Sequence, residues 1–150
     1  MNETLCLIRV GSEEYKAELD LRNEILRKPI GLDLYSEDMS REDMDWHIGA
    51  FMDGALVGCL ILTPLDSEKI KMRQVAVKED HQGLGIGTKL VAYSEVFARE
   101  RGYRRIVLAA RKTALEFYAK LGHEVVGEAF LEVGILHFKM TKDISVGGEQ

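Results

Sequence analysis

The spacing of apolar residues along the chain changes repeatedly between a strand-like and a helix-like period. A short apolar run at 5–10 predicts a strand, and Ser12 followed by charged residues is typical of the start of a helix. That helix is expected to end near Pro29, because the residue before a proline avoids helical geometry. Residues 30–45 are acidic with scattered apolar positions, which predicts a long loop containing a helical turn.

The clearest strand signals lie in the rest of the chain. Asp53-Gly54 separates apolar runs at 46–52 and 55–63, and this dipeptide between such runs predicts a tight hairpin. Residues 70–77 alternate and then become continuously apolar, as in a central strand. Further strands are predicted at 105–110, 124–130 and 135–140. Helical patterns cover 85–101, closed by Gly102, and 113–121, closed by Gly122.

This order of elements predicts an α/β fold, α+β in some schemes, with helices on both faces of a mixed, mostly antiparallel central sheet. We expect about six or seven strands in that sheet. At 150 residues the chain fits one compact domain. We assign the domain to residues 1–144 and expect residues 145–150 to form a flexible tail.

Composition narrows the class of protein. Hydrophobic residues make up 46% and charged residues 30%, an ordinary globular mixture, and the formal net charge is −5. The chain lacks the general basic surface that nucleic acid requires, and its apolar runs are shorter than the ~20 residues of a membrane-spanning helix. The apolar part of the N-terminus is too short for a secretory signal, so we expect a cytoplasmic protein. The sequence leaves open whether the protein forms a homodimer.

The two cysteines indicate neither a disulfide framework nor a metal site. Cys6 and Cys59 lie in predicted strands, far from any cysteine or histidine at metal-ligand spacing. We expect both to be reduced and buried, and we expect no metal.

The segment with the most chemical information is a glycine-rich turn that joins the strand at 75–77 to the next helix. Alternate glycines allow successive backbone N–H groups to converge, and the positive end of the helix dipole adds to them, which favours a pyrophosphate. A dinucleotide fingerprint is excluded because Thr88 and Leu90 stand where it needs glycines. A Walker loop is excluded because Gly87 is followed by Thr88 and not by lysine.

Two motifs carry a resemblance to a known family. The run Gln82-Gly83-Leu84-Gly85-Ile86-Gly87 resembles the Q/R-x-x-G-x-G/A pyrophosphate loop of GNAT acetyltransferases, and 75–77 resembles their pantetheine-pairing strand. Residues 114–123 are similar to the family's A-x-x-F-Y-x-K-x-G-F helix. The resemblance implies acetyl-CoA as co-substrate, held by Val75, Ala76, Val77, Gln82, Gly83, Leu84, Gly85, Ile86, Gly87, Thr88, Arg111, Phe117 and Tyr118. Two positions depart from the pattern: Arg111 stands where the family often has asparagine, and His123 replaces its phenylalanine.

The resemblance also implies roles in catalysis. Attack of an amine on a thioester needs a base, a donor to the developing oxyanion and an acid for the leaving thiolate. Tyr118 matches the family's general acid, and a backbone N–H on the 75–77 strand, which resembles the family's β-bulge, is the expected oxyanion donor. The base is left open between His137 and Glu132, whose hairpin resembles a Glu-x-Gly-Ile-x-His pattern of small bacterial members.

These features predict an N-acetyltransferase acting on a primary amine of an unidentified small molecule or peptide. Arg73 or Gln74 is a candidate to line the acceptor cleft, and the acidic residues at 37–45 either form a hydrated surface or attract a cationic amine. The alternative function is a non-catalytic GNAT domain that senses acyl-CoA.

Overall fold

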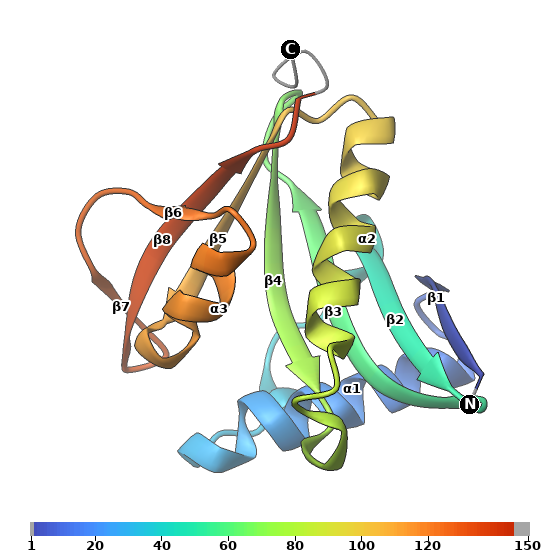
Figure 1. Ribbon diagram of the computed structural model, residues 1–150. Coiled ribbons are helices and arrows are strands. Elements are labelled where there is room, and N and C mark those ends of the chain that lie inside the picture. The colour runs from blue at the N-terminus through green and yellow to red at the C-terminus, as the bar shows by residue number, and fades with distance from the viewer. Residues whose placement is uncertain (1, 146–150) are drawn as a thin grey trace. The chain divides into compact units, whose positions relative to one another are not determined.

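The computed structural model describes residues 2–145, and Figure 1 labels its helices and strands. The helices are α1 (Glu13–Leu26), α2 (Ile86–Glu100) and α3 (Leu115–Lys120). The strands are β1 (Glu3–Ile8), β2 (Trp46–Met52), β3 (Ala55–Pro64), β4 (Lys69–Val77), β5 (Arg105–Arg111), β6 (Glu124–Val125), β7 (Phe130–Glu132) and β8 (Ile135–Asp143).

The predicted fold class is confirmed, with more strands than the sequence indicated. Hydrogen-bonded neighbours follow the order β1-β2-β3-β4-β5-β8-β6, and β7 also pairs with β8. The described residues therefore form an eight-stranded sheet. Every pairing described is antiparallel except that of β4 with β5. The predicted strand at 124–130 is divided into β6 and β7 by a bend at Gly127, which accounts for the higher number.

Two compact units make up the chain. The first comprises the residues up to Thr63 together with Gln74–Ser94, and the second comprises Pro64–Arg73 together with the residues from Glu95 onward. The single domain at 1–144 stays a prediction. Of the predicted tail, residues 146–150 lie outside the described residues.

In the first unit, α1 packs against the strands that lead to the glycine-rich turn. Ser12 caps α1 by accepting a hydrogen bond from the Tyr15 N–H, as its position in the sequence predicted. Leu21 of α1 lies in one buried cluster with Cys59 of β3 and Ala76 of β4. A Cβ on Gly58 of β3 would lie 2.9 Å from a Leu90 methyl carbon, so the start of α2 is seated closely on β3. The turn between β4 and α2 is therefore anchored on both sides.

The segment between α1 and β2 has more structure than a loop with one helical turn. It contains three 3-10 helices, at Lys28–Ile30, Leu34–Ser36 and Glu42–Met44. Leu34 is buried, and its N–H donates to the Asn23 side chain of α1 over 2.8 Å. Glu42 is also buried, so the acidic segment is not a uniformly hydrated surface.

The second unit is built on the long antiparallel pair of β5 and β8. Arg105 to Arg111 of β5 lie opposite Asp143 to His137 of β8, and the first residues of β4 pair with β5 in parallel. Ile106, Leu108 and Met140 are buried between this pair and its neighbours. No helix among the described residues is long and apolar enough to cross a membrane.

Candidate active site

The turn between β4 and α2 exposes backbone groups in the way an anion requires. Gly83 and Gly85 have φ of +83° and +84°, a region that residues with a Cβ rarely adopt. Nothing lies within 4 Å of a Cβ built on either residue, so conformation and not space requires glycine there. The Gln82 side chain donates to the Val77 carbonyl over 2.9 Å and ties the turn to the end of β4. The first N–H groups of α2 have no acceptors within the helix, and they lie at this open turn.

A cavity of about 740 Å³ lies beside the turn within the first unit. It is bounded by α1, by Leu56 of β3 and by the residues between β4 and α2. Its charged lining residues are four carboxylates and one cation: Asp20, Glu24, Glu79, Asp80 and Lys78. A cavity with this excess of carboxylates favours a cationic guest.

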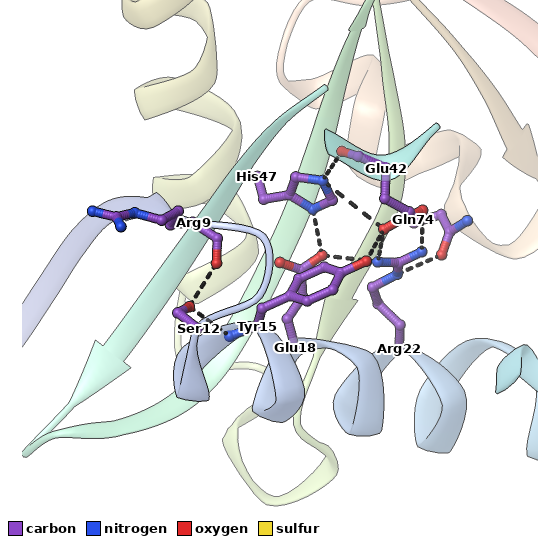
Figure 2. Close-up of polar contacts among 8 residues, drawn as sticks. All are labelled: Arg9, Ser12, Tyr15, Glu18, Arg22, Glu42, His47 and Gln74. Carbon is purple, nitrogen blue, oxygen red and sulfur yellow. Dashed lines mark hydrogen bonds and ion pairs between the residues drawn. The ribbon is translucent and has the colours of Figure 1, made fainter. Parts of the chain in front are cut away.

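The first unit also contains a buried cluster of charges, which Figure 2 shows in close-up. Arg22 of α1 has no exposed surface. Its Nη1 lies 2.9 Å from Glu18 Oε2 and 2.8 Å from Glu42 Oε1, and its Nη2 lies 3.1 Å from Glu42 Oε2. Burial alone would raise the pKa of the Glu42 carboxyl, but hydrogen bonds and charge from Arg22 outweigh it, and the pKa is lowered. The guanidinium is therefore held by the ionised Glu42 carboxylate and by a hydrogen bond to Glu18.

His47 on β2 closes the cluster on the other side. Its Nδ1 lies 2.7 Å from Glu18 Oε2 and its Nε2 lies 2.8 Å from the Glu42 carbonyl oxygen. Both partners are acceptors, so both ring nitrogens are satisfied when each carries a proton. Burial lowers the pKa of His47, but the hydrogen bond and charge of Glu18 raise it by a larger amount, so the net shift of the pKa is upward. A protonated His47 and the Arg22 guanidinium then both lie against the carboxyl groups of Glu18 and Glu42.

Glu18, Glu42 and His47 could be taken for a metal site, because one ligand atom from each lies within 4.8 Å of the others. Arg22 argues against this interpretation. Its Nη1 already lies within 2.9 Å of an oxygen of each glutamate, so a metal cation would have to displace a guanidinium. The arrangement is typical of an ion-pair network.

Tyr118, the predicted general acid, lies on α3 in the second unit. Its side chain is buried, and this burial raises the pKa of its phenol to about 12. The ring makes edge-to-face contacts with Phe117, at 4.9 Å between ring centroids, and with His123, at 5.6 Å. Neither ring nitrogen of His123 has a hydrogen-bond partner within residues 2–145, and burial lowers the pKa of His123. The surroundings of Tyr118 are therefore mostly apolar.

The two candidate bases come together in the hairpin of β7 and β8. Its two-residue turn, Val133-Gly134, has positive φ at both residues, which is the preferred geometry for such turns. His137 is buried, stacks on Phe130 and points its Nδ1 at the Ile135 carbonyl oxygen over 2.8 Å. Its Nε2 lies 4.0 Å from Glu132 Oε2. A neutral His137 whose Nδ1 carries the proton therefore keeps a lone pair on Nε2, facing a carboxylate.

Comparison with known proteins identifies the family. The sequence profile of the acetyltransferase (GNAT) family matches residues 13–123. The chain belongs to this family. Two Bacillus subtilis proteins described as uncharacterized N-acetyltransferases match over most of their length. YitI is 25% identical over 135 residues, which span 86% of this chain and 91% of YitI. YjcF is 28% identical over 138 residues, which span 91% of this chain and 98% of YjcF. A third, uncharacterized protein from the same organism, YyaT, is 32% identical over 75 residues, which span 50% of this chain and 51% of YyaT.

Solved structures support the GNAT fold. A GNAT family acetyltransferase from Elizabethkingia anophelis, with acetyl-CoA bound, has a TM-score of 0.73 at 21% identity and covers 95% of this chain and 98% of that one. An acyl-CoA N-acyltransferase from Pseudomonas aeruginosa has a TM-score of 0.77 at 20% identity, with 94% and 99% covered.

Within this GNAT chain, the predicted site residues are divided between the two units. The residues predicted to bind the cofactor from β4 and the turn, Val75–Val77 and Gln82–Thr88, lie in the first unit. Arg111, Phe117 and Tyr118 lie in the second unit with His137 and Glu132. Arg111 is the last residue of β5 and lies directly across the ladder from His137.

Sequence reasoning missed the buried charge cluster. Glu18 and Arg22 are four residues apart on α1, a spacing that suggests an ion pair on a helix surface and gives no sign of burial. No feature of the sequence around His47 indicates that its side chain is buried in an ion-pair network. Cys59 is buried as expected, whereas Cys6 is partly exposed, and both are free.

Proposed function

We propose that the protein transfers an acetyl group from acetyl-CoA to a primary amine of a small molecule or peptide. The observation that carries this proposal is the open turn at Gly83 to Thr88, with its two positive-φ glycines at the start of α2. In a chain of the acetyltransferase (GNAT) family, such a turn fits the pyrophosphate of acetyl-CoA.

The residues present fit this co-substrate. The backbone N–H groups of the turn would hold the phosphates, and the exposed side of Gly83 and Gly85 leaves room for them. Residues 75–77 of β4 would hold the arm that leads to the thioester. Acetyl-CoA supplies an acyl carbonyl that is activated by its thiol leaving group.

Tyr118 is our candidate for the general acid, which hydrogen-bonds or protonates the leaving thiolate. Burial raises the pKa of its phenol to about 12, so the hydroxyl is protonated at neutral pH and is a hydrogen-bond donor there. The Phe117 ring beside it offers no competing hydrogen bond.

His137 is our first choice for the base that accepts the amine proton. Its Nδ1 is committed to the Ile135 carbonyl, so Nε2 is the nitrogen available to accept a proton. Glu132, 4.0 Å away, would stabilise the resulting imidazolium. Glu132 is the second candidate, acting directly or through water.

An amine acceptor agrees with the charge of the cavity beside the turn. Four carboxylates against one lysine would favour a cation there. The acceptor must then lose its proton before it reacts, because an ammonium group has no lone pair.

The proposal is tested by mixing the protein with acetyl-CoA and a panel of amines and following the release of CoA thiol. Release that depends on one class of amine would support the proposal and identify the acceptor. Tight binding of acetyl-CoA without release, across polyamines, amino acids, aminoglycosides and peptides, would instead favour an acyl-CoA sensor.

A further inference from the structure

Gln74 has a backbone conformation that a strand residue rarely adopts. It lies within β4 at φ +53°, in the left-handed region, although it is not a glycine. A residue of this kind interrupts the regular pleat and redirects the peptide groups beside it. The residues that follow, Val75 to Val77, are those expected to donate a backbone N–H to the acetyl carbonyl.

One side chain reaches Gln74 from outside the sheet. Arg22 Nε donates to Gln74 Oε1 over 2.7 Å, and the two residues are 52 positions apart in the sequence. The other nitrogens of Arg22 are occupied by Glu18 and Glu42. Because the guanidinium is planar and its two Nη atoms are bound by carboxyl groups, the direction of the Nε–H bond is fixed. That bond points toward Gln74 (Figure 2).

The groups around Arg22 are themselves fixed. Glu18 Oε2 also receives His47 Nδ1, and Glu42 Oε1 also receives the Tyr15 hydroxyl over 2.8 Å. Contacts from α1, β2 and the segment before β2 thus converge on a single guanidinium. Tyr15, Glu18, Arg22 and Glu42 are all buried.

Stability alone is a poor explanation for this cluster. Removing charges from water costs about as much as a buried ion pair returns, and hydrophobic replacements of such networks are often neutral or stabilising. The cluster also leaves Glu18 Oε1 buried without a partner within the described residues. Holding neighbouring groups in one geometry is a second role that such networks have in some proteins.

We propose that Arg22 is a positioning residue for acetyl transfer, which holds Gln74 in its left-handed conformation and so aims the backbone N–H groups that follow it. Glu18, Glu42 and His47 act through Arg22, because their contacts fix the position of its guanidinium group. This inference rests on the proposed function and adds a residue on α1 that touches neither the acyl group nor the amine.

The test removes the contact at Gln74 and leaves the charges in place. Gln74→Met keeps the length of the side chain but cannot accept from Arg22 Nε, whereas Gln74→Glu restores an acceptor oxygen. Lys71→Met, on the same strand and outside the cluster, is the matched control. We expect Gln74→Met to lower kcat about 10- to 100-fold, the usual effect of a small misplacement, with acetyl-CoA affinity close to the parent. The melting temperature should fall modestly, because the buried Arg22 Nε–H loses its acceptor. Gln74→Glu should recover most of kcat, and Lys71→Met should match the parent.

A second measurement does not depend on turnover. Amide hydrogen exchange, followed by NMR, should be faster at Val75 and Ala76 in Gln74→Met than in the parent and the Lys71→Met control. If the parent releases no CoA with any amine, the proposed function fails, and this exchange measurement still decides the positioning role.

The inference is overturned by any of three results. The first is an unchanged kcat and exchange rate in Gln74→Met. The second is a loss of kcat that comes with weaker acetyl-CoA binding, since that indicates a general structural role. The third is a loss that Gln74→Glu does not recover.

Discussion

Replacing Gly85 with valine tests the assignment of the anion site most directly. Gly85 has φ +84°, and a Cβ built there meets no atom within 4 Å. Valine would therefore cause no collision, and its whole effect would be the cost of the left-handed conformation, about 1–3 kcal/mol for a residue with a side chain. If binding needs the native turn, that cost raises the Kd for CoA about 5- to 150-fold.

The chain offers a closely matched control in the hairpin turn between β2 and β3. Gly54 has φ +85°, also with nothing within 4 Å of an added Cβ. Gly54→Val should lower the free energy of unfolding by a similar amount, because the backbone conformation is nearly the same. It should leave CoA binding unchanged, because Gly54 does not belong to the turn at Gly83 to Thr88.

Titration calorimetry with CoA and urea denaturation, applied to both variants, separate the two effects. Two outcomes would refute the reasoning. One is a folded Gly85→Val protein that binds CoA as tightly as the parent, which would move the anion site elsewhere. The other is an equal loss of affinity in Gly54→Val, which would attribute the effect to general destabilisation.

Three further predictions concern protons. Tyr118→Phe keeps the ring and its packing but removes the donor, so kcat should fall about 10-fold or more while the KM for acetyl-CoA changes less; an unchanged kcat under rate-limiting chemistry would exclude Tyr118 from the mechanism. His137→Gln should lower kcat/KM at neutral pH and leave acetyl-CoA affinity intact, and an unchanged kcat/KM would turn attention to Glu132. The pKa of His47 is raised on folding, so its contribution to stability is complete below an unfolded pKa of about 6.5 and is lost as pH rises through the folded value. The urea midpoint of the parent should therefore decrease with rising pH above that point, and a decrease as steep in His47→Gln would contradict this assignment.

Features set by neighbouring residues could be predicted from the sequence. The Asp53-Gly54 turn has positive φ at both residues, because aspartate and glycine tolerate a conformation that the twist of a hairpin demands. Ser12 caps α1 through a hydrogen bond to a residue only three positions away. The glycine-rich turn before α2 is equally local, since Gly83 and Gly85 can adopt positive φ without the clash that a side chain would cause. For these features the relevant physics is confined to a few consecutive residues.

The buried charge cluster was decided by tertiary structure alone. Charged residues on an amphipathic helix or in an acidic loop normally face water, so nothing in the sequence indicates that Arg22 and Glu42 are buried. Burial became favourable only because partners 20, 29 and 52 positions apart met in one place: Arg22 with Glu42, Glu18 with His47, and Arg22 with Gln74. The left-handed conformation of Gln74 likewise has no local cause in a strand of apolar and polar residues. The family could therefore be recognised, and an anion site proposed, from consecutive residues. The contacts of β4 with the buried cluster depend instead on how distant segments pack.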